Sequence, residues 1–450
     1  MSIEPAAPDT FTSLTSALLP GAPGYDEARI SFNGLLDRHP AAIVPCATTQ
    51  DVVAAVRVAR AAGLPIAVRG GGHSVAGHAL PDDALVVSLA PMREVAVDPE
   101  RRLAHAGGGG LWDDVDAAAF AHGLAVTGGT FGDTGIGGLT LGGGIGWLLP
   151  VMGLTCDNLV EAEVVTADGS VVIAGPEGDP ELLWALRGGG GNFGVVTRFT
   201  YRLMPVGPMY GGQIDYPTSA AAEVLGRIDE VVDRWPTACL PTIGMGHGED
   251  GVPEITVLLA VVDGSDGETI ATTLRHDLPI RFEDIGPRTY LELQAQAGLL
   301  PFGMRHYWKG HFIRELDRAT LEALVEAVES PDAVEHAFVL LERITGAGRT
   351  EPAGGAAFGQ RAAGWNASAL AIWESPEVDD VAIGWSRRVA DILAPASLSG
   401  GGYVNYAPVD ETPDRVRATY GPERWDRLVA VKRRLDPENV FRFNHNIRPD

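Results

Sequence analysis

The segment from Arg69 to Ser74 reads Arg-Gly-Gly-Gly-His-Ser and gives one histidine a distinctive chemical setting. An apolar stretch, residues 66–68, precedes it and predicts a short strand. Three successive glycines let backbone N–H groups approach an anion such as a pyrophosphate. His73 then lies where a bound cofactor would pass. The alternative is a mobile turn with a solvated histidine, because Gly-rich turns are common.

Two further Gly-rich runs follow. In residues 128–146 the glycines alternate with apolar residues such as Ile136 and Leu139, whereas flexible linkers rarely carry such anchors. We therefore expect a coil that is pressed against a flat, charged ligand. Residues 187–194 match the glycine spacing of a dinucleotide fingerprint, but that fingerprint needs a strand before it and a helix after it. The predicted order here is the reverse, so an NAD site is rejected.

The tetrapeptide Tyr403-Val-Asn405-Tyr406 could carry proton transfer. Alternation along a strand would put Tyr403 and Asn405 on one face, with Tyr406 near the end. A tyrosine of lowered pKa can act as a general base. The alternative is an ordinary strand with packed aromatic side chains.

Two more segments could contact a ligand. Residues 439–447 contain three asparagines, whose amides can satisfy the polar edge of a flavin ring; a terminal loop is the alternative. Residues 306–311 form a compact polar and aromatic strand that could face a substrate, and a surface strand is equally compatible with the spacing.

The elements that would position these residues fall into two patterns. Short strands and helices alternate between residues 41 and 205, with hairpins joining 95–97 to 103–106 and 160–166 to 170–173. After the segment 205–208, strands and longer helices alternate up to residue 398, which indicates an α+β arrangement with an antiparallel sheet. In this second part we expect strands at 255–262 and 337–341, helices at 220–235, 321–329 and 378–393, and then a last helix at 424–434.

Composition narrows the classes of partner. The chain has 450 residues and a formal net charge of −25, which argues against nucleic acid and anionic membranes because both attract basic patches. No apolar run reaches the length of a membrane-spanning helix, and Met1 to Leu19 lacks the pattern of a secretory signal. Cys46, Cys156 and Cys239 are too dispersed for a disulfide framework or a metal cluster. We expect a cytoplasmic protein without a metal ion.

These motifs occur in an order that resembles the berberine-bridge-enzyme-like FAD oxidoreductases, within the vanillyl-alcohol-oxidase or PCMH type of flavoprotein. The bacterial, nicotine-oxidising members look most similar, and the plant enzymes and sugar oxidases less so. The resemblance spans residues 35–447 and rests on the segments 69–74, 128–146, 153–158, 184–194, 403–406 and 439–447.

The resemblance implies an α+β fold. Residues 1–207 would form a PCMH-type FAD-binding domain of two α/β subdomains. Residues 208–398 would form a substrate-binding domain with an antiparallel sheet flanked by helices. Residues 399–450 would return to the FAD domain.

The resemblance also implies FAD as the cofactor, held by a single covalent bond from His73 to the 8α-methyl group of the flavin. Many relatives add a second bond from a cysteine, but the matching stretch, 130–135, contains none. Cys156 is expected to be a small buried residue near the cofactor. The other implied cofactor-binding residues are Arg69, Gly70, Gly71, Gly72, Ser74, Gly77, His78, Gly129, Thr130, Thr134, Gly137, Gly138, Gly142, Gly143, Gly146, Asp157, Asn158, Gly194, Val196, Asn444 and Asn446.

For catalysis the resemblance implies hydride transfer from a substrate carbon to flavin N5, then reoxidation by dioxygen to hydrogen peroxide. Tyr406 would take the hydroxyl proton, its anion being favoured by nearby positive charge or hydrogen bonds. The other residues expected at the substrate are Tyr403, Lys309, His306, Trp308 and Trp147.

The expected substrate is a small alcohol, sugar or polyol. One alternative is oxidation of an amine, in which replacing Tyr406 by Phe should matter little. Another is oxidative tailoring of a secondary metabolite with an electron acceptor other than dioxygen. A flavin-binding protein without catalysis is disfavoured, because Tyr406 and Lys309 are both present.

Overall fold

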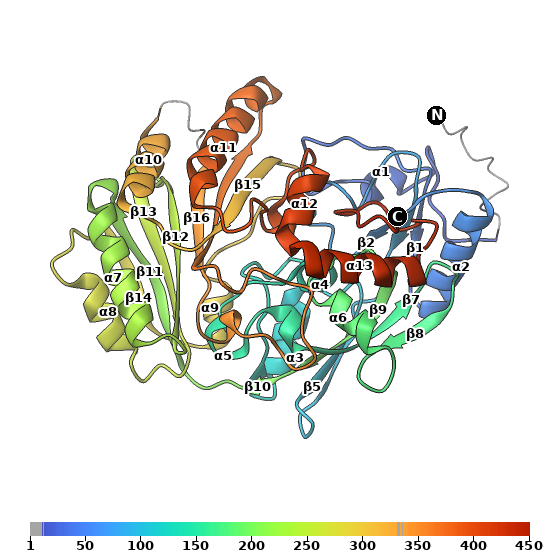
Figure 1. Ribbon diagram of the computed structural model, residues 1–450, viewed down its shortest axis with the longest axis horizontal. Helices are drawn as coiled ribbons and strands as arrows, with labels where there is room; N and C mark the ends of the chain where they lie inside the picture. The colour runs from blue at the N-terminus through green and yellow to red at the C-terminus, as the bar shows by residue number, and fades with distance from the viewer. Residues whose placement is uncertain (1–10, 12, 331–333, 335) are drawn as a thin grey trace.

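The computed structural model describes residues 11, 13–330, 334 and 336–450 (Figure 1). Most of the expected first domain is therefore described, while residues 1–10 and 12, which include much of the segment tested for a secretory signal, lie outside the described residues. The architecture is a mixture of helices and mostly antiparallel sheets, so the α+β expectation is confirmed.

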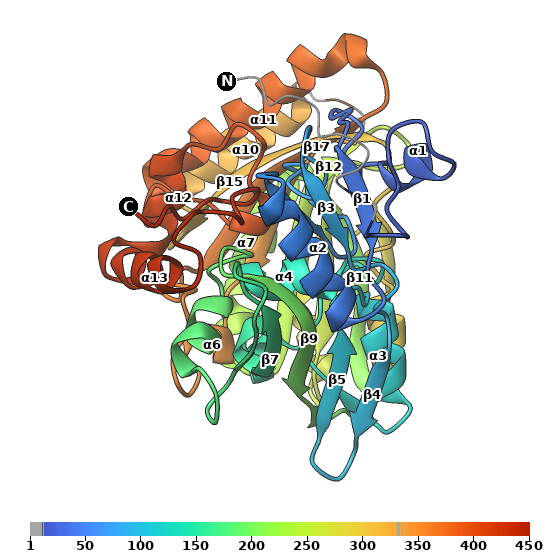
Figure 2. The same ribbon diagram turned by 90° about the vertical axis from the view of Figure 1, so that its right-hand side faces the viewer.

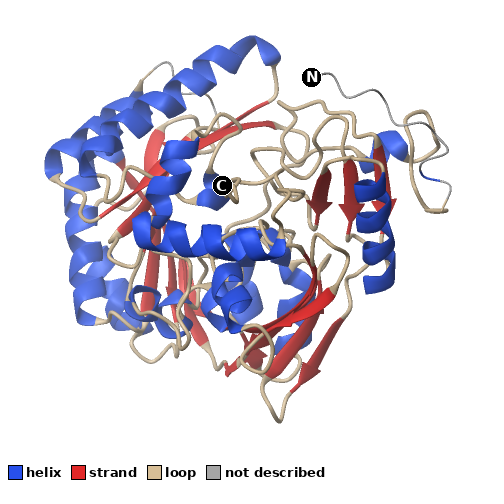
Figure 3. Cartoon of the chain, turned by 45° about the vertical axis from the view of Figure 1, so that its right-hand side comes forward, coloured by secondary structure: helices blue, strands red, loops and turns tan. Residues whose placement is uncertain are grey.

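A small parallel sheet carries the segment that leads to His73. Its order is β1 (Ala42–Pro45), β3 (Leu85–Ser88), β2 (Ile66–Arg69), and α2 (Thr49–Ala61) packs beside it (Figure 3). As predicted, α2 begins at a capping box between Thr48 and Asp51, a cap worth about 1 kcal/mol. Its apolar face is buried against the sheet, and β2 runs directly into the first Gly-rich loop.

A five-stranded antiparallel sheet supports the other Gly-rich runs (Figure 2). Both expected hairpins are confirmed, as β4–β5 and β7–β8. The run 128–146 is not entirely coil, because its apolar residues support the short helix α4. The elements are β4 (Val95–Asp98), β5 (Leu103–Gly107), β9 (Val195–Arg202), β7 (Leu159–Val165), β8 (Val171–Ala174), α3 (Trp112–Phe120), α4 (Ile136–Gly142), α5 (Leu149–Met152) and α6 (Pro180–Leu186), with the short pair β6 (Leu124–Ala125) and β10 (Met204–Pro205) beside them.

A seven-stranded antiparallel sheet forms the other half of the molecule, in the order β14-β11-β13-β12-β16-β17-β15. The helices α7, α8, α10 and α11 cover its outer face (Figure 1). The expected helices and strands between residues 220 and 393 are confirmed within a few residues. The bounds are β11 (Met209–Pro217), α7 (Ala221–Arg234), β12 (Cys239–His247), β13 (Pro253–Val261), α8 (Gly267–Arg275), β14 (Phe282–Arg288), α9 (Tyr290–Gln294), β15 (Arg305–Ile313), α10 (Arg318–Glu329), β16 (Phe338–Arg343), β17 (Trp365–Trp373) and α11 (Asp379–Leu393).

Strand alternation gives this sheet two different faces. On β16, Val339 and Leu341 pack with the outer helices. Phe338 and Leu340 pack on the inner face, in a cluster with Trp308 of β15. Since side chains alternate along a strand, Glu342 shares the inner face with Phe338 and Leu340. Around β16 the inner face therefore carries a carboxyl group next to apolar side chains.

The C-terminal segment returns to the Gly-rich half of the chain. The helices α12 (Pro413–Tyr420) and α13 (Pro422–Leu435) lie in front of it (Figure 1). Tyr420 donates a hydrogen bond to the carbonyl of Gly188, and the backbone N–H of Ile447 donates to the Asn192 side chain. We keep the division at residues 207 and 398 as a proposal.

A buried ion pair fastens this return. Both side chains of the pair between Lys432 Nζ and Asp436, 2.7 Å apart, are fully buried. Lys432 also donates to the carbonyls of Asn192 and Phe441. Three acceptors, one from the Gly-rich half and two from the C-terminal segment itself, thus converge on one ammonium group.

Replacing Lys432 by Met should lower the free energy of unfolding by about 3–5 kcal/mol, because it leaves the Asp436 carboxylate buried without its partner. Urea denaturation of the purified protein measures this loss. Arg434→Met, which removes an exposed ion pair with Asp179 from the same helix, is the control and should cost less than about 1 kcal/mol. Equal losses for the two variants would contradict the importance of the buried pair.

Candidate active site and cofactor cavity

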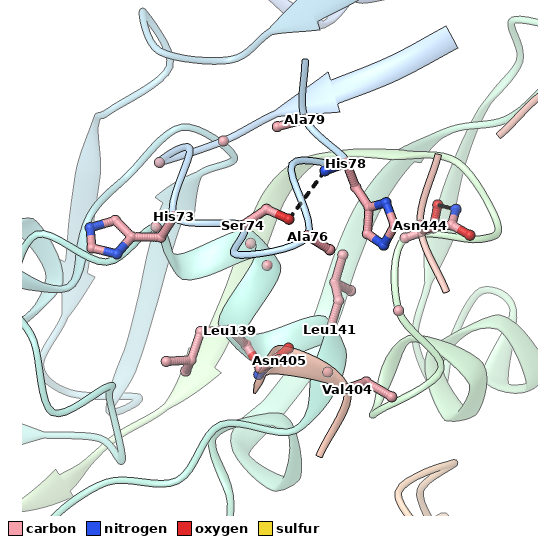
Figure 4. A pocket seen from close by; sticks show the side chains of 18 of the residues that line it. His73, Ser74, Ala76, His78, Ala79, Leu139, Leu141, Val404, Asn405 and Asn444 are labelled. Carbon is pink, nitrogen blue, oxygen red and sulfur yellow. Dashed lines mark hydrogen bonds between the residues drawn. The ribbon is translucent and has the colours of Figure 1, made fainter. Parts of the chain in front are cut away.

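A cavity lies between the Gly-rich loops and C-terminal residues that include Val404, Asn405 and Asn444 (Figure 4), and the seven-stranded sheet contributes Trp308 to its wall. It encloses about 1720 Å³ of non-atom space, part of which opens to solvent. The expected site residues on its wall are Gly70, Gly71, Gly72, His73, Ser74, His78, Thr130, Thr134, Gly137, Gly138, Gly142, Gly194, Val196, Trp308, Tyr403, Tyr406 and Asn444.

His73 and His78 leave the same loop in opposite directions (Figure 4). The His73 ring stacks on Phe32, with ring centroids 4.5 Å apart, and meets the edge of Phe302 at 4.9 Å. Its Nε2 lies 3.3 Å from an oxygen of Asp133. His73 is therefore held on three sides at one end of the cavity.

His78 marks the other end, where its ring meets that of His445 at 4.9 Å and Asn444 is adjacent (Figure 4). Burial lowers the pKa of His78 to about 3, with a smaller contribution from His445, so its ring is neutral. His78 Nε2 and Asn444 Oδ1 are buried and have no hydrogen-bond partner among the described residues. Buried polar atoms are rarely left without partners, and these two face a cavity in which a polar ligand would supply them.

The glycines on the wall also fit a flat ligand. A Cβ added to Gly138 or Gly191 would have no atom within 4 Å, so a side chain there would project into open space. A Cβ on Gly71 would lie 2.4 Å from the Cα of Gly135, so these two loops touch backbone to backbone. Together with the unpaired polar atoms, this smooth wall fits FAD, whose ring is flat and whose pyrophosphate accepts hydrogen bonds from backbone N–H groups.

At the sheet end the wall is aromatic. Rings follow one another from Phe32 to Trp308 (centroids 6.1 Å apart), from Trp308 to Tyr406 (5.3 Å) and from Tyr406 to Tyr403 (5.0 Å). This end is thus connected by ring contacts to the histidine that stacks on Phe32. The surrounding cluster on the inner face contains Val75, Leu300, Leu370, Ile372, Phe131, Met304, Phe338 and Leu340.

Tyr403, Asn405 and Tyr406 do not lie in a strand, so that prediction was wrong. Residues Val404–Tyr406 form a turn of 3₁₀ helix, closed by a hydrogen bond from the Tyr406 N–H to the Tyr403 carbonyl. The Tyr403 hydroxyl accepts hydrogen bonds from the Gly144 N–H and the Asn405 amide. These bonds fix the turn against the Gly-rich run. The turn, and not a strand, brings the Tyr403 and Asn405 side chains to the same contact.

Tyr406 has a raised pKa, contrary to the expectation of a stabilised anion. Burial is the main cause, and the nearby charge of Glu342 adds to it. The Tyr406 hydroxyl donates to Glu342 Oε1 at 3.1 Å. No Lys or Arg side chain lines the cavity in the part of the chain that the structure describes, so the positive charge needed for a phenolate is missing from the wall.

Glu342 is the functional candidate that the sequence analysis missed. It is 2% exposed, and its Oε2 accepts a hydrogen bond of 2.7 Å from Asn366 on β17. Burial raises the pKa of Glu342 to about 7, although hydrogen bonds from Asn366 and Tyr406 oppose that rise. The sequence signal that could have identified it is an acidic residue near the end of an apolar strand. Its spacing of two and four residues from Leu340 and Phe338 puts it on the same face of the strand as those two side chains.

Three of the residues expected at the substrate lie away from the cavity wall. Lys309 points to the opposite face of β15 from Trp308, and its Nζ lies 3.9 Å from Glu411. His306 lies behind the wall, where its ring stacks on Phe32 at 4.3 Å. Trp147 is buried in the core of the Gly-rich half.

Several residues expected at the cofactor also lie behind the wall and support it. Asp157 pairs with Arg361 in a buried ion pair of 2.5 Å, and the Asn158 amide donates to the carbonyls of Met152 and Leu154. The remaining members of this group are Arg69, Gly77, Gly129, Gly143, Gly146 and Asn446.

Cys156 is a fully buried free thiol, and burial raises its pKa well above the ordinary value. It does not line the cavity. Among the described residues, no group of three or more His, Cys, Asp or Glu side chains is placed to hold a metal ion. Within the same residues, no helix is both long and apolar enough to cross a membrane.

Comparison with known proteins identifies the family. A family model described as an FAD binding domain matches residues 40–175, and a second, described as berberine and berberine like, matches residues 402–448. The chain is 32% identical to (R)-6-hydroxynicotine oxidase of Paenarthrobacter nicotinovorans over 96% of both chains.

Solved structures agree with this. The crystal structure of 6-hydroxy-D-nicotine oxidase from Arthrobacter nicotinovorans superposes with a TM-score of 0.85 at 30% identity, covering 96% of this chain and 98% of the other. A berberine-bridge-enzyme-like protein of Physcomitrella patens has the same fold, with a TM-score of 0.88 at 22% identity over 98% and 99% of the two chains. The chain therefore belongs to the berberine-bridge-enzyme-like family of FAD-linked oxidoreductases.

Proposed function

We propose that the protein is an oxidase of a small, largely apolar alcohol, with FAD attached through His73 and dioxygen as the electron acceptor. One observation carries this proposal: Tyr406, which lines the cavity, donates a hydrogen bond to a buried carboxyl group, Glu342, that lies behind the cavity wall. An acid that is poised near neutral pH beside a bound redox cofactor is the arrangement that proton abstraction requires.

The flavin, when bound, accepts a hydride from the substrate carbon and passes two electrons to dioxygen, which forms hydrogen peroxide. Backbone N–H groups of the loops 70–74 and 137–142 would hold its pyrophosphate, and Asn444 would bind a polar edge. His73 would hold the flavin in place covalently.

Tyr406 and Glu342 would act as a relay. Tyr406 lines the cavity, and its hydroxyl would take the substrate hydroxyl proton while its own proton moves along the existing hydrogen bond to Glu342. The phenol stays neutral at the end of this transfer, which agrees with its raised pKa. The Asn366 amide holds the other oxygen of Glu342 and keeps the carboxyl group aimed at Tyr406.

The surroundings of the relay favour a substrate with an apolar body. The neighbouring side chains are Trp308, Leu300, Leu370 and Ile372, and burying a hydroxyl against them without a partner costs free energy. A sugar or polyol would bury several hydroxyls there. The buried Trp308 Nε1 has no partner among the described residues, so it can donate one hydrogen bond to a substrate oxygen. Anaerobic mixing with a panel of aromatic and alicyclic alcohols, amines and sugars tests this class, and bleaching by sugars alone would contradict it.

Amine oxidation is the second candidate. It is favoured by the similarity to (R)-6-hydroxynicotine oxidase. A neutral amine needs no proton acceptor for hydride transfer, so Tyr406→Phe should then change kcat/KM little. A large loss in that variant would favour an alcohol.

Acid precipitation should leave the yellow colour on the wild-type chain, with a mass increase of one FAD on the peptide that contains His73. His73→Ala should release its flavin into the supernatant, because no covalent bond remains. Cys156→Ser is the control and should keep the flavin attached, since this thiol is buried and does not line the cavity. Flavin found on a Cys156 peptide would refute the single attachment.

With an alcohol substrate, kcat/KM should rise with pH through about 7 and then level off, because only the ionised form of Glu342 accepts a proton and burial raises its pKa to about 7. Glu342→Gln should lower kcat/KM by about 100-fold or more and abolish this rise. Steady-state rates between pH 5 and 9 measure both effects. Glu254→Gln, on β13 of the same sheet, is the matched control, because the hydrogen bond from Tyr406 goes to Glu342 and not to this residue. An unchanged pH profile in Glu342→Gln would rule out the relay.

A further inference from the structure

Asp133 lies beside His73 in a setting that isolates the two side chains from other partners. Nε2 of His73 and Oδ2 of Asp133 are 3.3 Å apart. His73 Nε2 and Asp133 Oδ1 are both buried, and neither has a hydrogen-bond partner among the described residues. The two side chains are thus in close contact without a hydrogen bond between them.

The backbone brings this pair together. Gly71 and Gly135 touch. His73 comes two residues after Gly71 and Asp133 two residues before Gly135, so the loops run in opposite directions past each other. The stacked ring of Phe32 and the edge of Phe302 restrict the tilt of the imidazole. Of the two ring nitrogens, Nε2 is the one that lies within reach of the carboxylate.

We infer that Asp133 is a positioning residue for covalent attachment of the flavin: it holds His73 in the tautomer whose proton is on Nε2, so that Nδ1 presents its lone pair as the nucleophile. A carboxylate that orients a histidine through its far nitrogen is a general way to fix both tautomer and ring direction. The inference rests on the proposed attachment through His73.

In the attachment step the 8α-methyl carbon is oxidised and the flavin ring is reduced by two electrons. His73 Nδ1 forms a bond to the 8α-carbon while one C–H bond of that methyl group breaks, and its proton passes to solvent. The electron pair of the C–H bond enters the flavin ring, which is reduced by two electrons and takes up protons from water. The Nε2 proton of His73 passes to Asp133, so no charge stays on the linked imidazole. Dioxygen then reoxidises the flavin and is itself reduced to hydrogen peroxide.

The test compares full-length Asp133→Asn with wild type. Both are purified with bound FAD, incubated with added FAD in air, and sampled over time by acid precipitation and intact mass. Asp133→Asn should still hold FAD before acid treatment but lose most of it on precipitation, with attachment slowed about 100-fold. Asp133→Glu, which restores the carboxylate, should regain attachment. A purely structural role would instead reduce FAD binding and attachment together.

Asp113→Asn is the matched control. This carboxyl group is a near neighbour of Asp133 but no ion pair joins it to His73 among the described residues, so attachment should proceed as in wild type. A second, independent readout is the nitrogen that carries the flavin in the wild-type flavopeptide, assigned by NMR. Attachment at Nδ1 is expected, and attachment at Nε2 would overturn the inference, because that nitrogen faces Asp133.

Attachment in Asp133→Asn at the wild-type rate would also overturn the role of Asp133 while leaving the proposed function intact. Release of all FAD from acid-treated wild type would instead overturn the covalent bond itself, and the inference with it. If Asp133→Asn holds no FAD, then Asp133→Glu and the linkage atom decide: attachment in that variant through Nδ1 supports the inference, and its absence refutes it.

Discussion

The close approach of Gly71 and Gly135 is the constraint on which the end of the cavity at His73 depends. A Cβ on either residue would lie 2.4 Å from backbone atoms of the other, so any side chain would push the two loops apart. Because the loops run past each other in opposite directions, the same contact sets His73 beside Asp133. It also places the loop from β2 against the Gly-rich run that includes α4. The glycines are therefore needed for backbone contact between loops as well as for access to a ligand.

The two ends of the cavity differ in the charged and polar groups that they present. At the loop end, a pyrophosphate would meet backbone N–H groups and neutral polar side chains such as His78. At the sheet end, one carboxyl group is buried without a cation on the cavity wall among the described residues. An arginine beside Glu342 would lower the pKa of that carboxyl by favouring its charged form. Its absence from the wall leaves the pKa near 7, where the group can both accept a proton and return it.

The sequence was sufficient to predict local motifs, but it did not show which residues far apart in the chain lie together in the fold. The loop 69–74, the two hairpins and the rejection of an NAD site all depend on neighbours along the chain, and the structure has the corresponding elements. Glu342 was missed because a single acid in a strand carries no motif, and its function depends on Tyr406, 64 residues away. Lys309 was misplaced for a related reason: its one-residue offset from Trp308 puts it on the other face of β15. Tyr403 and Asn405 alternate like strand residues, but their hydrogen bonds to residues 139–144 require a turn.

The cavity is assembled from segments spread along nearly the whole chain, from Ile66 to His445, and its last wall arrives with the C-terminal segment. Lys432 joins that segment to Asn192 and forms the buried ion pair with Asp436, so this pair fastens the C-terminal wall of the cavity. A ligand that binds only the folded chain, in which the cavity is assembled, stabilises that state in proportion to the logarithm of the free ligand concentration. Covalent attachment would remove that dependence, because a linked flavin cannot be diluted away from its site. A bond at His73 would thus act on the stability of the closed cavity as well as on the redox chemistry inside it.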